Sequence, residues 1–345
     1  MMKIRLFLLG AALVVSHICA FAQNTDEVKR RPRHRFDAQC PDVHDPVMAF
    51  EDGKYYIFAT GNGISVMSSS DMKTWKEEKP VFAKAPEWAV NAVPGYRGHT
   101  WAPDIYYSDG LWYLFYSCSA FGKNTSAIGV AVNKTLNPES PEFLWEDRGM
   151  VVQSVPGKDN WNAIDPNLVV DKKGTPWLCF GSFWDGIQMI KLGSDMQLPA
   201  KKAKFMTVSR RKYSGAKDMK ELSGEANDNA VEAPFIVRNG DYYYLFVSFD
   251  YCCRGLNSTY KTAVGRSKKI TGPYIDRNGK KMGEGGGTVL LEADDDYAGI
   301  GHCSVYEFGG QWYIVAHAYS KAHNGASKLF IRKMKFDAEG WPVLE

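Results

Sequence analysis

A pattern that recurs five times along the chain constrains its fold more than any other feature. In each copy, a glycine that ends a turn is followed by a short run of aromatic and β-branched residues. The five runs are Gly53–Phe58, Gly110–Phe115, Gly174–Phe180, Gly240–Leu245 and Gly310–Val315. Successive glycines are 57, 64, 66 and 70 residues apart. A glycine that allows positive φ between two apolar runs is typical of a β-hairpin turn.

Further short runs surround each hairpin. An apolar run precedes each glycine, a third run follows each hairpin, and some copies continue into a fourth strand marked by an aromatic residue. These aromatic residues are Trp75, Trp145, Tyr274 and Trp341. Four short strands repeated five times predict an all-β fold, a five-bladed β-propeller forming a single domain over residues 40–345. A two-sheet sandwich is the structural alternative, but it does not explain so regular a period.

The repeat also accounts for an unusual composition. Aromatic residues make up 13% of the 345 residues, and there are 32 glycines. Length alone would suggest about two domains. With 45% hydrophobic and 23% charged residues, the chain is not expected to be disordered. A formal net charge of +3 lacks the basic stripe that phosphate binding needs, so we expect no nucleic-acid partner.

The first 22 residues are typical of a secretory signal peptide. Lys3 and Arg5 precede a short apolar run, and Ala20-Phe21-Ala22 forms a cleavage site. The run is shorter than the roughly 20 apolar residues that span a membrane, so we expect no membrane span. Residues 23–39 follow as a polar leader.

The signal predicts export without fixing the destination, which is the periplasm or the medium. Ser16-His17-Ile18-Cys19 is a weaker alternative, a degenerate lipoprotein site, because His17 and Ile18 are not the small residues expected there. We expect the mature protein to be a monomer.

Six cysteines remain after the signal, which is too few for a disulfide scaffold. Cys118 and Cys179 lie inside apolar runs and are expected to be buried thiols. The adjacent Cys252 and Cys253 are interpreted as part of a packed loop, because no Cys-x-x-Cys motif indicates redox chemistry.

Acidic residues recur at one position of the repeat. Counting eight residues back from each hairpin glycine, with a one-residue correction for the longer third turn, gives Asp45, Ala102, Asp165, Glu232 and His302. The innermost strands of a propeller converge at one channel, so these residues should lie at one level of it. One such acid is usually a turn residue. Three in register raise one another's pKa, so that one can stay protonated near neutral pH as a general acid.

Acidic clusters with aromatic surroundings favour glycosidic-bond hydrolysis, in which two carboxyl groups flank the bond and aromatic faces stack on sugars. A calcium site would need about six to eight oxygen ligands. The run Asp294-Asp295-Asp296 would suit such a site better, but we interpret it as a solvated turn. Asp104 lies two residues beyond Ala102, deeper in the channel, and is interpreted as structural.

Several segments resemble glycoside hydrolase family 43, and within it the endo-arabinanases, from about Pro41 to Tyr319. The segments are His44-Asp45-Pro46, Trp101-Ala102-Pro103-Asp104-Ile105, Asn162-Ala163-Ile164-Asp165-Pro166, Gly181-Ser182-Phe183-Trp184, Glu232-Ala233-Pro234, Cys252-Cys253-Arg254-Gly255 and Ser258-Thr259-Tyr260-Lys261. Asp-Pro and Glu-Ala-Pro are weak motifs alone. Their order and phase across five blades make the resemblance specific.

The resemblance implies an inverting hydrolase that cleaves internal α-1,5-linked arabinofuranose bonds of arabinan. It implies that Asp45 is the general base, Glu232 the general acid, and Asp165 the carboxylate that orients the acid and raises its pKa. Inversion would place the acid and base about 6.5–9.5 Å apart rather than about 5 Å. Trp101, Phe183 and Trp184 are expected to stack on sugars, with core packing as the alternative. Asn162 and Ser182 are expected to hydrogen-bond them.

His302 matches a family position that holds a central ion, usually calcium, through one imidazole and several waters. Cys303 stands where many members have Asn, and a hydrogen-bonded core histidine is the alternative. Two other functions stay open. One is an exo-acting α-L-arabinofuranosidase or β-xylosidase of the same fold. The other is a non-catalytic glycan-binding propeller, which would not need the three carboxylates.

Overall fold

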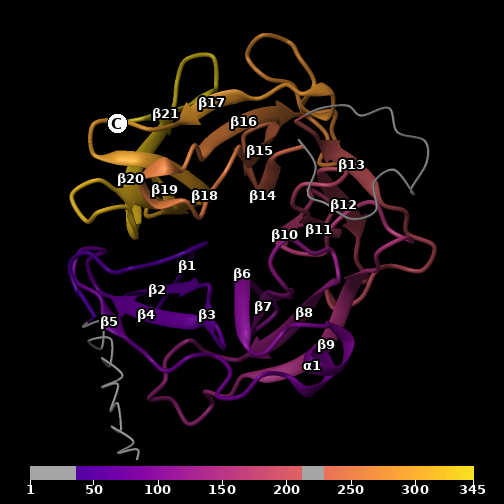
Figure 1. The fold of residues 1–345 in the computed structure, drawn as a ribbon, viewed down its shortest axis with the longest axis vertical. Helices are drawn as coiled ribbons and strands as arrows, with labels where there is room; N and C mark the ends of the chain where they lie inside the picture. The colour runs from indigo at the N-terminus through magenta and orange to yellow at the C-terminus, as the bar shows by residue number, and fades with distance from the viewer. Residues whose placement is uncertain (1–35, 212–228) are drawn as a thin grey trace, which may run out of the picture. The chain divides into compact units, whose positions relative to one another are not determined.

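Five antiparallel sheets, arranged as blades around one axis, make up the chain in a computed structural model that describes residues 36–211 and 229–345 (Figure 1). The expected signal peptide and most of the polar leader lie outside these described residues. Each blade has four strands in chain order, and the second blade carries one further short strand at its edge. The five-bladed propeller predicted from the repeat is confirmed.

The strands of the blades have the following bounds. The first contains β1 (Val47–Glu51), β2 (Lys54–Ala59), β4 (Ser65–Ser69) and β5 (Lys76–Glu77). The second contains β3 (Gly61–Asn62), β6 (His99–Ser108), β7 (Leu111–Cys118), β8 (Ser126–Asn133) and β9 (Glu146–Ser154). The third contains β10 (Asn167–Val170), β11 (Pro176–Phe180), β12 (Ile187–Lys191) and β13 (Met206–Ser209). The fourth contains β14 (Val231–Asn239), β15 (Tyr242–Phe249), β16 (Lys261–Ser267) and β17 (Thr288–Leu291). The fifth contains β18 (Tyr297–Phe308), β19 (Gln311–Ser320), β20 (Ala326–Phe336) and β21 (Pro342–Leu344).

Helical structure in the described residues is limited to α1 (Glu87–Ala92) and the 3-10 turns η1 (Gly255–Asn257) and η2 (Met282–Glu284). Within those residues, no helix combines the length and apolar character needed to cross a bilayer. Apolar side chains of neighbouring blades pack between the sheets. Leu114 of β7, Phe246 of β15 and Ile314 of β19 belong to one such cluster and are fully buried. Cys118 and Cys179 are buried free thiols, as predicted.

The hairpin glycine of every blade has positive φ. The values are +79° at Gly53, +83° at Gly110, +77° at Gly174, +56° at Gly240 and +81° at Gly310. Residues with a Cβ adopt this conformation only at a cost, so the repeated glycine is a direct requirement of the first hairpin of each blade.

One strand assignment is wrong. Tyr274 does not mark the fourth strand of blade four, because residues 288–291 form that strand. Pro273 directly precedes Tyr274 and has no N–H to donate to a ladder. The Tyr274 side chain is fully buried, and its hydroxyl donates to the Ile270 carbonyl at 2.6 Å. Tyr274 is therefore a core residue of the long loop between β16 and β17.

The start of the described chain completes the last blade. Val43 N–H donates to the Ser327 carbonyl at 3.1 Å, and Leu329 N–H donates to the Pro41 carbonyl at 3.1 Å. The buried Lys328 side chain forms an ion pair with Asp42 at 2.8 Å. The segment before β1 thus pairs with β20, which joins the first blade to the fifth.

Candidate active site

The inner ends of the blades share an unusual backbone conformation. Asp45, Ala102, Asp165, Ala233 and His302 all have positive φ, between 33° and 57°. Four of these are the residues aligned from the sequence. In blade four the aligned residue was Glu232, and the structure places it one position before the matching residue, Ala233. The sequence alignment was therefore one residue out in that blade.

Side chains of the preceding blade hold this conformation. The Thr60 hydroxyl accepts a hydrogen bond from the Ala102 N–H at 2.8 Å. The Ser117 hydroxyl accepts one from the Asp165 N–H at 3.0 Å. The Ser248 hydroxyl accepts one from the His302 N–H at 2.7 Å. His317 Nδ1 accepts the Asp45 N–H at 3.1 Å.

Blade three lacks such a side chain. Thr60, Ser117 and His317 each lie seven residues after their hairpin glycine, and the residue seven after Gly174 is Gly181. The Asp165 carboxylate instead accepts the Ala233 N–H at 3.1 Å. Asp165 thus has a fixed orientation, because its carboxylate replaces the missing side chain of blade three as the acceptor for Ala233 N–H of blade four.

Asp45 is held as a carboxylate. Its Oδ1 lies 2.9 Å from His302 Nδ1, and its Oδ2 accepts a hydrogen bond from the Thr60 hydroxyl at 2.5 Å. Burial raises the pKa of Asp45, but the charge and hydrogen bond of His302, with help from His44, outweigh burial and hold that pKa well below its usual value. Burial lowers the pKa of His302, yet the three carboxylates raise it to about 9. This pair is therefore charged near neutral pH.

Asp165 and Glu232 favour the opposite protonation state. Burial raises the pKa of Asp165 to about 8, with added repulsion from Glu232 and Asp45. Burial also raises the pKa of Glu232, against hydrogen bonds from Ser182 to Oε2 and from Tyr260 to Oε1, both 2.7 Å long. Repulsion between two carboxylates is mutual, so the pair retains a proton near neutral pH.

All nine residues predicted for the site line one cavity of about 850 Å³. They are Asp45, Trp101, Asn162, Asp165, Ser182, Phe183, Trp184, Glu232 and His302. Asn162 is 3% exposed, and its Oδ1 has no hydrogen-bond partner in the described residues. Leaving a buried acceptor unpaired is costly. This oxygen has almost no accessible surface, so the hydrogen bond from Asn162 to a sugar stays a prediction.

The predicted sugar contacts are not equally available. Phe183 is partly exposed, and its ring lies 5.9 Å from that of Tyr251. Trp184 is only 4% exposed, so most of its ring packs in the protein as the core alternative proposed. The Ser182 hydroxyl is directed to Glu232, which makes it part of the acid's surroundings.

A sequence profile of Glycosyl hydrolases family 43 matches residues 41–342. The chain belongs to this family. Among solved structures, an exo-1,5-α-L-arabinanase from a bovine ruminal metagenomic library is 62% identical, with a TM-score of 0.84 over 91% of this chain and 100% of that chain. An α-L-arabinanase of Cellvibrio cellulosa, complexed with arabinohexaose, is 48% identical, with a TM-score of 0.85 over 89% and 96% of the two chains. The extracellular endo-α-(1→5)-L-arabinanase 1 of Bacillus subtilis is 42% identical over 87% of both chains.

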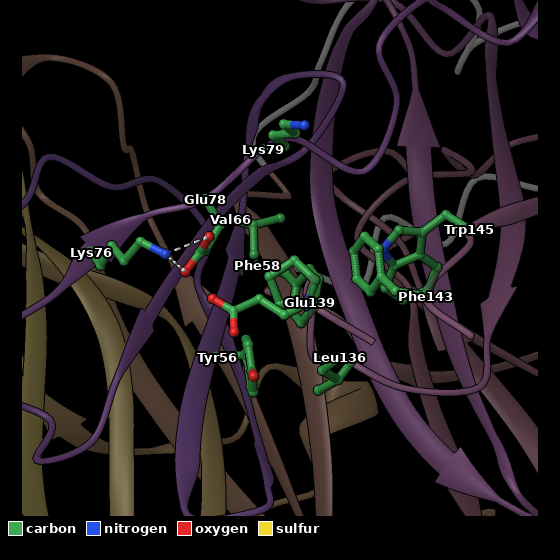
Figure 2. A pocket seen from close by; sticks show the side chains of 11 residues that line it. Tyr56, Phe58, Val66, Lys76, Glu78, Lys79, Leu136, Glu139, Phe143 and Trp145 are labelled. Atoms are coloured by element: carbon green, nitrogen blue, oxygen red, sulfur yellow. Dashed lines mark hydrogen bonds and ion pairs between the residues drawn. The ribbon is translucent and has the colours of Figure 1, made fainter. Parts of the chain in front are cut away.

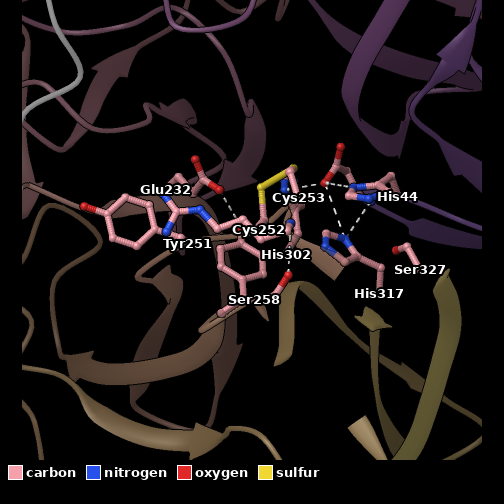
Figure 3. The surroundings of a disulfide bond; sticks show 12 residues. His44, Glu232, Tyr251, Cys252, Cys253, Ser258, His302, His317 and Ser327 are labelled. Carbon is pink, nitrogen blue, oxygen red and sulfur yellow. Dashed lines mark hydrogen bonds and ion pairs between the residues drawn. A yellow bond between two sulfur atoms is a disulfide. The ribbon is translucent and has the colours of Figure 1, made fainter. Parts of the chain in front are cut away.

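Several residues in or beside this cavity had no role predicted from the sequence. Tyr260 is part of one family motif, and its hydroxyl donates a hydrogen bond to Glu232. Cys252 and Cys253 form a disulfide that lines the cavity (Figure 3), whereas the sequence indicated only a packed loop and left their bonding open. Adjacency of the two cysteines was the one available signal, and it does not distinguish thiols from a disulfide.

The donors near His302 do not by themselves fit a calcium ion. Its Nδ1 already contacts Asp45, and the only grouped metal-ligating side chains among the described residues are His44, Asp45 and His317. Two imidazoles and one carboxylate offer nitrogen where calcium prefers many oxygens. Calcium at His302 stays a prediction that would depend on water ligands, and we assign no step to a metal.

Two other acidic features behave as predicted. Asp104 is buried and accepts hydrogen bonds from Leu168 N–H at 2.6 Å and Asn167 Nδ2 at 3.3 Å, which link blades two and three. The exposed Asp294 accepts from the backbone N–H groups of Asp296 and Tyr297, as in a solvated turn.

A second cavity, of about 300 Å³, lies between blade one and the β8–β9 connection (Figure 2). Aromatic side chains, among them Phe143 and Trp145, line it together with Lys76 and Glu139. None of the three site carboxylates lines this cavity. The chemistry of the chain is therefore placed in the larger cavity.

Proposed function

We propose that the protein hydrolyses internal α-1,5-L-arabinofuranosidic bonds of arabinan with inversion of configuration. One observation carries the proposal. A single cavity holds Asp45 with a lowered pKa and Glu232 with a raised pKa. Two carboxyl groups whose environments move their pKa values apart are suited to serve as base and acid. The family 43 relatives supply the substrate class.

In this mechanism, the ionised Asp45 accepts a proton from a water that attacks the anomeric carbon. Thr60 and His302 fix its carboxylate, so both oxygens keep their orientation. Glu232 donates its proton to the leaving glycosidic oxygen. Asp165, oriented by Ala233, opposes the ionisation of Glu232 until that transfer occurs.

The roles are tested by Asp45→Asn and Glu232→Gln. Each should lower kcat on linear arabinan at least about 100-fold, because general acid–base catalysis contributes about 10²- to 10⁴-fold. The control is Asp104→Asn, which removes a buried carboxyl group outside the cavity. This variant should retain the wild-type kcat on linear arabinan. Near-normal release of reducing ends by either site variant would reject the assignment. Inversion predicts that NMR of early product shows the β-anomer, and an α-anomer would reject it.

Exo action is the second candidate, because the relative with 62% identity is described as an exo-1,5-α-L-arabinanase. An endo enzyme releases a range of oligosaccharides early and lowers the viscosity of linear arabinan quickly. An exo enzyme releases one short product and leaves viscosity high. Saturable binding without any product would instead support a glycan-binding propeller.

We further propose export through the signal at residues 1–22, with periplasmic or secreted protein as its destination. The B. subtilis relative is described as extracellular. Sequencing of the mature N-terminus should give Gln23 first. A monomer is expected, and light scattering of the purified protein measures it.

A further inference from the structure

A disulfide between consecutive residues forms part of the cavity wall. Cys252 and Cys253 are bonded, with Cα atoms 3.8 Å apart. Both line the cavity that also contains Asp45, Glu232 and His302. In the view of Figure 3, the disulfide is drawn between the Glu232 side chain on the left and His44 on the right. The other described cysteines are free thiols, so oxidation is confined to this position.

The loop that carries the disulfide, between β15 and β16, is held in place. Cys253 has φ of 64°, and its N–H donates to the Tyr319 hydroxyl at 2.7 Å. Cys252 packs against the buried cluster of Tyr260, Ala298 and Tyr319. Thr259 N–H donates to the Tyr251 carbonyl at 3.0 Å, which joins the two ends of the loop. The two sulfur atoms therefore occupy fixed positions.

Neighbouring side chains extend this surface. The Arg254 guanidinium lies 4.1 Å from the centre of the Tyr251 ring, and the Phe183 ring lies 5.9 Å from that ring. We name this surface the disulfide wall: Phe183, Tyr251, Cys252, Cys253 and Arg254, all of which line the cavity. It combines apolar rings and sulfur with the hydrogen-bond donors of one guanidinium.

We propose that the disulfide wall binds one arabinofuranose ring of the substrate beside the general acid. This inference rests on the proposed function and adds a sugar-binding role for the disulfide. The C–H face of a furanose needs an apolar, polarisable partner, which sulfur provides. Arg254 can donate to the ring hydroxyls. Cys252 packs against the cluster that contains Tyr260, and Tyr260 hydrogen-bonds Glu232. Since the two cysteines and Glu232 line the same cavity, a sugar on this wall lies near the acid.

A closed disulfide gives this contact an advantage over two thiols. The bond through consecutive residues leaves neither side chain free to rotate, so binding costs no side-chain entropy there. Dithiothreitol reduces the disulfide to two thiols and is itself oxidised to its cyclic disulfide. Each thiol can then rotate and gains a polar S–H. We therefore expect reduction to weaken substrate binding while the acid and base remain.

The test compares the mature enzyme, oxidised and reduced, with a Cys252→Ser/Cys253→Ser double variant. The measurements are KM and kcat on arabinohexaose, and arabinohexaose affinity by calorimetry in a Glu232→Gln background. Reduction and the double substitution should each raise KM and Kd about tenfold, which is about 1.4 kcal/mol, and change kcat less than about twofold. Cys40→Ser, at a half-buried free thiol outside the cavity, is the control and should change neither quantity.

The outcomes separate binding from a structural clamp. Unchanged KM and Kd after reduction would overturn the proposal. So would a loss of kcat that accompanies a lower thermal unfolding midpoint, because that result assigns the disulfide to holding the loop. If the double variant does not fold, the comparison uses reduced wild type instead. An unchanged circular dichroism spectrum then shows that reduction has left the fold intact. If oxidised wild type cleaves no arabinan, the proposed function fails. The calorimetric comparison of the oxidised and reduced protein then still shows whether the disulfide wall binds arabinohexaose.

Discussion

Substituting Tyr260 with Phe should move the alkaline limb of the pH–activity profile to higher pH. The Tyr260 hydroxyl donates to Glu232 Oε1 at 2.7 Å, and this bond lowers the pKa of Glu232 against the effect of burial. Hydrogen bonds to charged groups contribute about 1.5–3 kcal/mol, and one pKa unit corresponds to about 1.36 kcal/mol. Losing the bond should therefore raise the pKa of Glu232 and move the alkaline limb by about one to two pH units. Because the acid must be protonated to act, activity should persist to higher pH by a similar amount.

The assay is kcat/KM on linear arabino-oligosaccharides across the pH range, since this quantity reports the pKa values of the free enzyme. Tyr116→Phe is a matched control. Tyr116 is also fully buried and donates to a carboxylate, Asp147, at 2.6 Å, but neither residue lines the cavity. Its substitution should leave the profile in place. An alkaline limb that stays fixed or moves down in Tyr260→Phe would refute the reasoning about the acid.

Two further predictions concern stability. Burial raises the pKa of Asp104 to about 7 despite hydrogen bonds from Leu168 and Asn167. The folded wild type is fully stabilised by this proton below about pH 4 and loses that stabilisation as the pH rises to about 7. Asp104→Asn carries no titrating group at this position. Its unfolding free energy, relative to that of the wild type, should therefore rise by up to about 4 kcal/mol between those limits. Urea unfolding at both pH values checks this, and a pH-independent difference contradicts it. Lys328→Met removes the ion pair with Asp42 and should cost about 1–3 kcal/mol with kcat unchanged; an unaltered unfolding midpoint would argue against that pairing.

The blades were predictable from sequence because their signals are local. A glycine with positive φ and an apolar run on each side specify a hairpin without reference to the rest of the chain. Counting forward from those glycines as well as back would also have found Thr60, Ser117 and His317, which hold the inner turns.

Other features depend on geometry that spacing does not record. Glu232 is one residue out of phase because Gly240 is the first of the two turn residues between Asn239 and Tyr242. In blades one, two and five the counted glycine is the second residue of the turn. The disulfide was missed because adjacent cysteines are compatible with both oxidation states. The protonation pattern of the site was predictable only in outline, since the identity of the protonated carboxyl depends on Ser182, Tyr260 and His302.

The pairing of the first segment with β20 has a consequence for how the protein folds. The Ser327 hydroxyl donates to the Val43 carbonyl across 284 residues of sequence. Contacts between distant parts of a chain form slowly, because the intervening loop must first be closed. The blades can each form from local hairpins, but the ring is joined only when almost the whole chain has left the ribosome. Late closure predicts that a partly synthesised chain resembles a row of separate blades, and that the inner cavity is assembled in the final step.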